Sequence, residues 1–343
     1  NYKVEDKMNF IDILKNGKDN GNDNEKLAVL YEKLKPDIVN HLKNITSTLP
    51  DFDIHDGLHS EKILQNMLVL IDAQNKENQF TGYEFFLLGL SAYMHDTGMA
   101  MPEWEVKLFK MIEGSHEFPL YDEDLNLNLN SDLKKPFSII EAKDFILKNT
   151  QTIYGDFAEI KNYIFIENNE EDFVSNLAKK MRNYQIFRSG YKSSLREIRD
   201  LNEYKRESLN LRYEFIRINH HIFSEKNCKN LTSEFQDSLG GTWGGKLAED
   251  LAKICLGHGV DYSEINNYEV KSRYVNGNYV NIKFLTVMLR LADVIHFSYE
   301  RAPKSLQASK MIDNQISLLH WKVKQEGVDY WLTDFNAKGQ REI

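Results

Sequence analysis

The chain has 343 residues, 41% of them hydrophobic, which is enough to bury the core of one large domain or of two smaller ones. Its net charge of −9 excludes non-selective binding of nucleic acid or anionic membrane by the whole surface, but leaves room for a local basic groove. Two cysteines, Cys228 and Cys255, are too few for a disulfide framework, and no apolar stretch reaches the length of a membrane span. With no signal peptide at the start, we expect a cytoplasmic protein with no membrane partner.

The N-terminal part of the chain predicts a loop followed by two helices. The polar, glycine-bearing segment 16–25 is typical of a mobile loop. Residues 81–96 begin with a capping box of Thr81 and Glu84 and are apolar nearly all round, which predicts a buried central helix ending at Gly98. Between these segments, residues 60–74 predict an amphipathic helix with six apolar residues on one side: Ile63, Leu64, Met67, Leu68, Leu70 and Ile71.

The C-terminal half predicts two further core helices and one strand. In residues 246–259 the apolar spacing of Leu247, Leu251 and Ile254 continues to His258, and Gly259 can cap the helix. Residues 281–298 predict another apolar helix, in which Asp293 is the only acid. Residues 329–335 alternate with a period of two and predict a short strand.

Polar residues interrupt these apolar helices, and they form a series: His59, His95 with Asp96, His220 with His221, His258, and Asp293. Each alone has another explanation as a core residue with its own hydrogen-bond partner, and Asp293 could pair with Arg290 three residues earlier. Burying several such groups separately is costly, whereas one cation satisfies imidazoles and carboxylates together. The series therefore predicts a divalent metal site, with donors suited to Mn, Fe, Co, Ni, Zn or Mg.

Five sequence blocks resemble, in order, those of the HD superfamily of metal-dependent phosphohydrolases: HDGLHSEKI, LSAYMHDTGM, RINHHIFS, ICLGHGVD and LRLADVIHFSYERAP. The family pattern is a helix-borne His, an adjacent His-Asp pair and a distant Asp on a last core helix. His59, His95 with Asp96, and Asp293 match it one by one. The resemblance covers roughly residues 50–115 and 210–305 and implies an all-α fold, the HD-domain helical bundle.

The resemblance also implies two metal ions and the residues that hold them. The first ion would take His59, His95, Asp96 and Asp293, and the second would take Asp96, His220 and His258. Asp96 is the natural bridge, because only a carboxylate among these groups offers two oxygens. His221 is the reserve ligand, since adjacent helical residues point about 100° apart. A ligand histidine needs an acceptor for its other ring nitrogen, and the candidates are Asp56 and Glu300.

Catalysis would then rest on Asp96 and His95, with Arg217 and Arg301 contacting substrate phosphate or bracing a ligand. The blocks 217–224 and 254–261 are similar to those of HD-GYP phosphodiesterases and CRISPR-associated HD nucleases, which have a second metal. No Gly-Tyr-Pro tripeptide occurs here, so specificity for cyclic di-GMP does not follow. The chain is also similar to HD domains joined to Hsp90-type ATPase modules, and its start at Asn1 and abrupt end suggest a fragment with an ATPase-type partner.

Seven of the eleven arginines lie between Arg182 and Arg217, and this cluster has two interpretations. It is either a solvated helix face rich in ion pairs or a phosphate-binding wall formed by Arg188, Arg196 and Arg199. The acidic segment 113–132 resembles a metal site, but we expect a surface loop because it lacks an apolar helical frame.

These features predict five segments: an N-terminal helical segment with a mobile loop (1–49), the first part of the HD core (50–115), a helical insertion (116–206), the second part of the core (207–305), and a C-terminal extension with a small β element (306–343). We expect a phosphohydrolase that cleaves a phosphate ester or anhydride of a nucleotide or nucleic acid with a metal-activated hydroxide. The alternative is a nucleotide- and metal-binding regulatory module that controls a partner domain without turnover. The sequence does not distinguish a nuclease, with an open groove, from a nucleotidase, with a closed pocket.

Overall fold

The computed structural model describes residues 9–18, 22–52, 55–73, 80–114, 136–191, 195, 198, 200–268, 272–275, 278–296, 301–310, 312 and 315–326. It divides into two compact units: unit 1 combines Asn1–Ala100 with His220–Ile343, and unit 2 is Met101–Asn219. Almost all regular structure is helical, which confirms the predicted all-α fold. Unit 2 contains residues 116–206, the range expected for the insertion, and extends beyond it at both ends. None of the described helices combines the length and the apolar character needed to cross a membrane.

Unit 1 is built around helix α5 (Gly82–Met94), in which every residue is buried. The predicted capping box is present: the Thr81 side chain accepts from the Glu84 backbone, and the Glu84 side chain accepts from the Thr81 backbone. The helix ends at Met94 rather than at Gly98. A short 3₁₀ turn, η2 (Thr97–Met99), follows it, because the backbone N–H of Met99 turns back to the Asp96 carbonyl.

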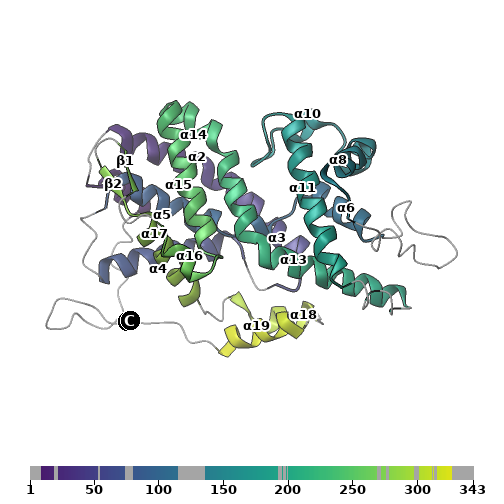
Figure 1. Ribbon diagram of the computed structural model, residues 1–343. Coiled ribbons are helices and arrows are strands. Elements are labelled where there is room, and N and C mark those ends of the chain that lie inside the picture. Colours follow the sequence, from purple (N-terminus) through teal and green to yellow (C-terminus); the bar gives the residue numbers. More distant parts are fainter. Residues whose placement is uncertain are drawn as a thin grey trace. The chain divides into compact units, whose positions relative to one another are not determined.

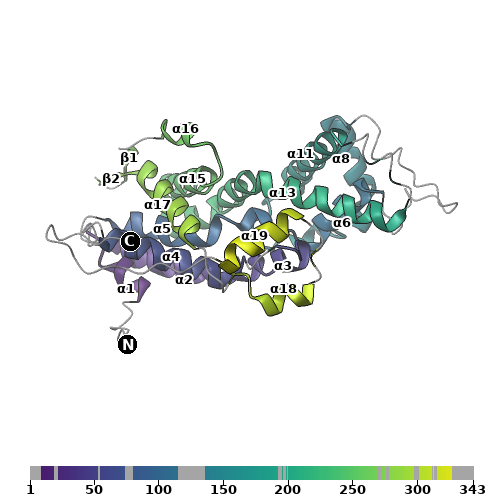
Figure 2. The same ribbon diagram turned by 90° about the horizontal axis from the view of Figure 1, so that it is seen from below.

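Five helices pack against α5 and can be followed in Figures 1 and 2. Their apolar faces supply the core that the sequence pattern predicts, including Ile63 and Met67 before α5 and Leu247 and Leu251 after it. The five are α1 (Phe10–Lys15), α2 (Asn22–Leu42), α4 (Gly57–Ala73), α15 (Gly241–Gly257) and α17 (Ile282–Ile295).

The N-terminal loop is shorter than predicted. Helix α2 already begins at Asn22, and Asp23 and Glu25 lie in its first turn, where carboxylates favour a helix N-terminus. A short helix, α3 (Asn44–Thr48), follows α2.

The remaining elements of unit 1 flank this bundle. Helix α14 (Thr232–Leu239) packs on α15. After the short helix α16 (Tyr262–Ile265), two strands pair antiparallel, β1 (Ser272–Val275) and β2 (Asn278–Val280). The sequence did not predict this strand pair, and the strand expected at 329–335 lies outside the described residues.

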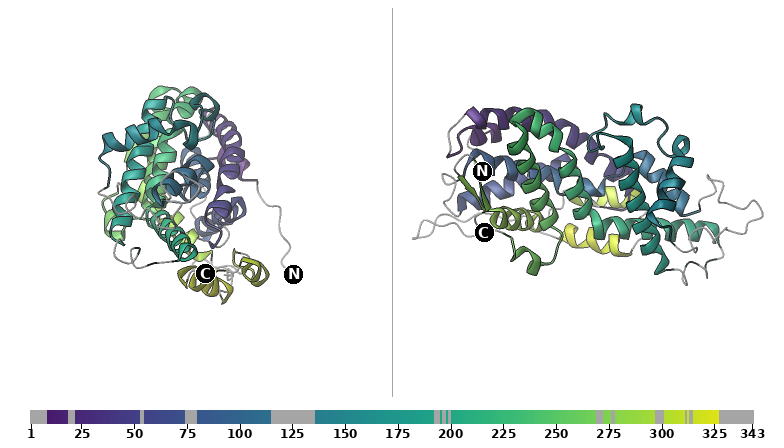
Figure 3. Two further views of the ribbon diagram at one scale, coloured as in Figure 1. Left: turned by 90° about the vertical axis from the view of Figure 1, so that its right-hand side faces the viewer. Right: turned by 45° about the horizontal axis from the view of Figure 1, so that its top comes forward.

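Two C-terminal helices, α18 (Lys304–Lys310) and α19 (Gln315–Glu326), form a small core of their own, in which Trp321 is fully buried. They are the yellow helices of Figure 3. The Trp321 indole donates to the Asp51 carbonyl at 2.9 Å, and Lys310 Nζ donates to the Pro50 carbonyl at 2.6 Å. The C-terminal helices are thus hydrogen-bonded to the segment that precedes His55.

Unit 2 is also helical and has a buried polar centre. Glu113 accepts from the Arg212 guanidinium and from the Tyr184 hydroxyl, so the buried charge is paired. The unit holds α6 (Glu103–Ile112), α8 (Ile139–Lys148), α9 (Thr150–Ile153), α10 (Phe157–Ile160) and α11 (Glu170–Ser189), and α13 (Leu201–Asn230) runs from unit 2 into unit 1.

Candidate metal centre

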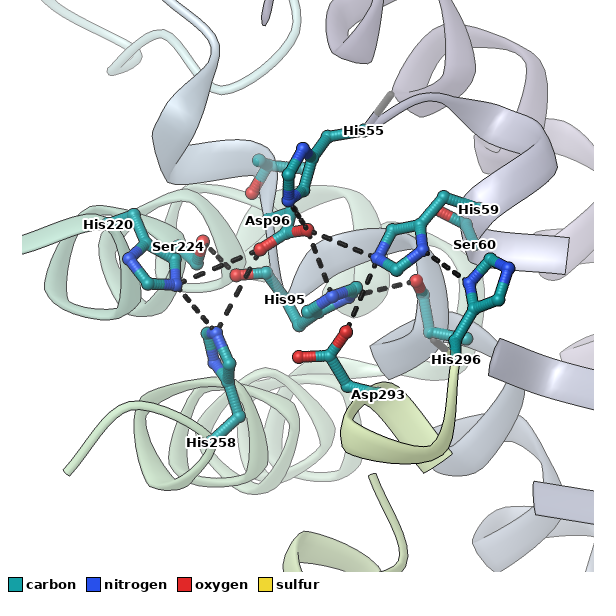
Figure 4. Close-up of polar contacts among 12 residues, drawn as sticks. His55, His59, Ser60, His95, Asp96, His220, Ser224, His258, Asp293 and His296 are labelled. Carbon is teal, nitrogen blue, oxygen red and sulfur yellow. Dashed lines mark hydrogen bonds and ion pairs between the residues drawn. The ribbon is translucent and has the colours of Figure 1, made fainter. Parts of the chain in front are cut away.

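Six of the predicted ligands come from five segments of unit 1 and point toward one another in Figure 4. His59 lies in the first turn of α4, and His95 and Asp96 directly follow α5. The other three come from later in the chain: His220 on α13, His258 at the C-cap of α15, and Asp293 near the end of α17.

Close packing around Gly98 brings α13 to the His-Asp pair. A Cβ at Gly98 would collide with the His220 carbonyl and the Ser224 backbone, so only glycine permits this approach. Ser224 joins the two segments, because its hydroxyl donates to the His95 carbonyl at 2.5 Å and accepts from the Gly98 N–H at 2.9 Å. The glycine of the HDTG sequence therefore sets the position of His220.

The ends of α15 and α17 are fixed to each other. Arg290 donates to the carbonyls of Gly257 and Val260, at 3.1 and 2.6 Å. The arginine beside Asp293 in the described part of the chain is Arg301 instead. Helix α15 ends at Gly257, with His258 as its C-cap. Gly259 is thus not the cap, and it permits close packing instead, since a Cβ there would meet the His221 ring.

A first ligand group is formed by His59, His95 and Asp96, whose donor atoms lie within 4.8 Å of one another. The Nε2 atoms of His59 and His95 lie 3.5 and 3.1 Å from Asp96 Oδ2. Both nitrogens are buried and have no hydrogen-bond partner in the described part of the chain. Asp293 is not within the same mutual distance, but its Oδ1 lies 3.4 Å from His59 Nε2. Buried imidazole nitrogens that face carboxylates are the donor set of a divalent cation, so the residues fit a metal.

A second ligand group is formed by Asp96, His220 and His258. Here the Nε2 atoms of the two histidines are hydrogen-bonded to each other at 2.8 Å, and they lie 3.8 and 4.0 Å from Asp96 Oδ1. The two oxygens of Asp96 therefore face different groups, as Figure 4 shows. His221 belongs to neither group, which leaves His220 as the residue of the pair that faces Asp96.

The charges of the cluster shift its pKa values in opposite directions. Burial lowers the pKa of His95, but Asp96 and Asp293 outweigh it and raise this pKa to about 9. Burial raises the pKa of Asp96, but His95, His59 and His55 hold it well below its usual range. Burial, with His220 and His95 nearby, lowers the pKa of His258 to about 3, so this imidazole is neutral at pH 7.

The other ring nitrogens of these histidines have partners. His95 Nδ1 lies 3.0 Å from the Ala92 carbonyl, and His258 Nδ1 lies 2.6 Å from the Cys255 carbonyl. His59 Nδ1 instead faces Nδ1 of His296 at 2.8 Å. Asp56 is one of the two predicted acceptors, but its carboxylate accepts from the backbone N–H groups of Leu58 and His59 and so caps the start of α4. The other candidate, Glu300, lies outside the described residues.

Two further histidines lie at the site, His55 and His296, to which the sequence pattern assigned no role. His55 Nε2 accepts from Arg301 Nη2 at 2.7 Å and lies 4.0 Å from Asp96 Oδ2. Arg301 is buried, and its Nη1 lies 3.8 Å from Asp293 Oδ1, so this guanidinium links His55 to a predicted ligand. The sequence signals were His55 four residues before His59 and His296 three residues after Asp293.

Of the three arginines of the predicted phosphate wall, Arg188 is the one that the structure describes. Arg188 is buried in unit 2 and donates to the hydroxyls of Tyr184, Tyr204 and Ser208. Arg217 makes two hydrogen bonds to Glu214 on its own helix. Arg196 and Arg199 lie outside the described residues, as does most of the acidic segment 113–132.

A helical bundle with two His/Asp groups that share one carboxylate defines an HD-type domain. The chain belongs to the HD-CE family, whose family model matches residues 49–341. No curated protein and no solved structure matches the chain. The closer likeness to HD-GYP enzymes, CRISPR-associated nucleases or Hsp90-linked domains therefore stays a prediction.

Proposed function

We propose that the protein is a metal-dependent phosphohydrolase that acts on a phosphate ester or anhydride of a nucleotide. The observation that carries this proposal is the pair of buried Nε2 atoms of His59 and His95, which lie 3.5 and 3.1 Å from Asp96 Oδ2. A divalent ion between these nitrogens and the carboxylates would satisfy all of them together. The bond between His220 and His258 must open before both can bind a second ion.

A divalent cation at this centre would lower the pKa of a bound water and polarise a phosphoryl oxygen. The chain's own residues supply the rest. Asp96 presents one oxygen to each ligand group, so it can hold two ions in fixed relation. Arg301 holds His55 toward Asp96 and lies beside Asp293. The exposed fractions of the side chains rise from 1% at His59 to 19% at His220 and 31% at Asp293, so substrate would approach past these last two.

A small nucleotide is a better candidate than a polynucleotide. A polynucleotide needs a row of cationic side chains that can reach its phosphates. Of the five described arginines in the Arg182–Arg217 cluster, however, Arg188 and Arg212 are buried in hydrogen bonds and Arg217 is bonded to Glu214, which leaves Arg182 half-buried and Arg206 exposed. One observation favours the regulatory alternative: His220 and His258 of the second ligand group are hydrogen-bonded to each other without an ion. An ATPase-type partner domain remains part of that alternative.

The test combines metal analysis of the purified chain with a turnover screen. Mononucleotides, cyclic dinucleotides, single-stranded DNA and RNA are each offered with Mn²⁺, Zn²⁺ or Mg²⁺, and the Asp96→Asn variant serves as the blank. We expect stoichiometric metal and release of product from a small nucleotide by the native chain alone. Metal and nucleotide binding without any turnover would favour the regulatory module, and a chain without metal would refute both.

A further inference from the structure

His296 is buried at the C-cap of α17, three residues after Asp293, and forms a pair with His59. The two Nδ1 atoms are 2.8 Å apart, and the ring planes lie within 13° of each other. Figure 4 shows the His59 ring between His296 on one side and the carboxylates on the other. His59 therefore contacts the candidate metal centre through one nitrogen and His296 through the other.

A hydrogen bond between two Nδ1 atoms contains one proton, and its position decides what His59 can do. With the proton on His59, the imidazole is neutral at Nε2, and this nitrogen can bind an ion. With the proton on His296, a neutral His59 carries its hydrogen on Nε2, facing Asp96 and Asp293, and cannot bind. The partner of His59 thus controls whether His59 is a ligand.

Two of the other three histidine ligands, His95 and His258, do not need such a partner. His95 and His258 each turn Nδ1 to the carbonyl three residues earlier, and a carbonyl can only accept. For His59 the residue three positions earlier is Asp56, whose carbonyl accepts from the backbone and the hydroxyl of Ser60. His59 lies in the first turn of its helix, so it needs an acceptor from elsewhere in the fold.

We propose that His296 is a positioning residue that accepts the Nδ1 proton of His59 and so fixes this ring as an Nε2 ligand. The inference rests on the metal centre of the proposed function. Groups that support a ligand histidine are usually carboxylates or carbonyls, and their loss costs roughly 10- to 100-fold in metal affinity. An imidazole in this place keeps the ring orientation but is a weaker acceptor than a carboxylate.

Three substitutions separate acceptor strength from packing. His296→Phe keeps a ring but has no acceptor, His296→Asn places an amide oxygen near the Nδ1 position, and His296→Asp places a carboxylate there. Affinity for Mn²⁺ is measured by competition with a chelator, and thermal melting of each metal-free variant reports folding. We expect roughly 10- to 100-fold weaker binding for the Phe variant, an affinity within a few-fold of native for Asn, and tighter binding for Asp.

A second readout follows the proton itself. In the Zn²⁺-loaded protein labelled with ¹⁵N-histidine, the Nδ1 resonance of His59 is expected to be that of a protonated nitrogen.

Three results would overturn the role of His296. They are a Phe variant that binds Mn²⁺ like the native protein, an Asn variant that binds it no better than the Phe variant, or an unprotonated His59 Nδ1. A native chain that bound no ion would refute the proposed function itself. A native chain that bound an ion, together with His296 variants whose Mn²⁺ affinities did not differ, would leave the metal centre in place and refute only the role of His296. A Phe variant that does not fold leaves the Asn and Asp variants and the Nδ1 resonance to decide.

Discussion

The two ligand groups share Asp96 but differ in how they satisfy their nitrogens without an ion. In the group of His59 and His95, both Nε2 atoms are buried and face carboxylates, and neither has a hydrogen-bond partner among the described residues. In the group of His220 and His258, the two Nε2 atoms bond each other. In the first group a cation takes the place of the His95 proton and faces two imidazoles and two carboxylates. In the second group it must open the hydrogen bond between the two imidazoles and faces one carboxylate. We therefore expect the two ions to bind unequally, the first more tightly.

The largest expected effect follows from removing the shared carboxylate. Asp96→Asn should abolish binding at both groups and reduce turnover at least about 10³-fold, because several kcal/mol of charge stabilisation are lost. Metal content and turnover are measured together. Asp250→Asn is the matched control, since Asp250 is a buried carboxylate bonded to Tyr83 and belongs to neither ligand group. Two ions retained by the Asp96 variant would remove the basis for a shared bridge.

A pair of histidine substitutions separates the two groups. His59→Gln should weaken the tight ion at least about 100-fold, since losing a group that only supports a ligand already costs 10- to 100-fold. His258→Gln should leave the tight ion unchanged and lose only the weaker one. Calorimetric titration of both variants with Mn²⁺ checks this order. Equal effects of the two changes would mean that the groups are not distinct.

The pH dependence should also differ between the groups. The pKa of His95 is raised to about 9, above its ordinary value, so at pH 7 the ion must displace a proton from this ring. Affinity of the tight ion should therefore rise about tenfold per pH unit from pH 7 and level off near pH 9. The pKa of His258 is lowered to about 3, so no such proton competes there. Chelator competition from pH 6.5 to 8.5 measures the slope, and a flat profile for the tight ion would contradict the assignment.

The smallest effect is expected at Arg217. Its pair with Glu214 is a partly exposed contact on one helix, worth about 0.2–0.5 kcal/mol. Arg217→Ala should therefore leave metal affinity and turnover unchanged and shift thermal stability only slightly. A large loss of turnover with unchanged stability would instead support the predicted catalytic role of Arg217.

The sequence predicted the central helix, its capping box and the residues that the fold brings together, because apolar periodicity and polar interruptions are local signals. It could not predict the contact between His59 and His296, which joins positions 237 residues apart through packing. It also could not tell that Arg188 is buried, because a run of basic residues does not reveal which side chains face the core. The strand pair of β1 and β2 was missed because strands of three or four residues carry little sequence pattern.

The most direct test of the shared carboxylate is anomalous diffraction from crystals soaked in Mn²⁺ at increasing concentration. We predict one peak between His59, His95 and Asp96 at low concentration, and a second beside His220 and His258 at higher concentration, roughly 3.5–4 Å from the first. Both peaks should contact Asp96, one through each oxygen. A peak that does not contact Asp96, or a second group occupied before the first, would contradict the account.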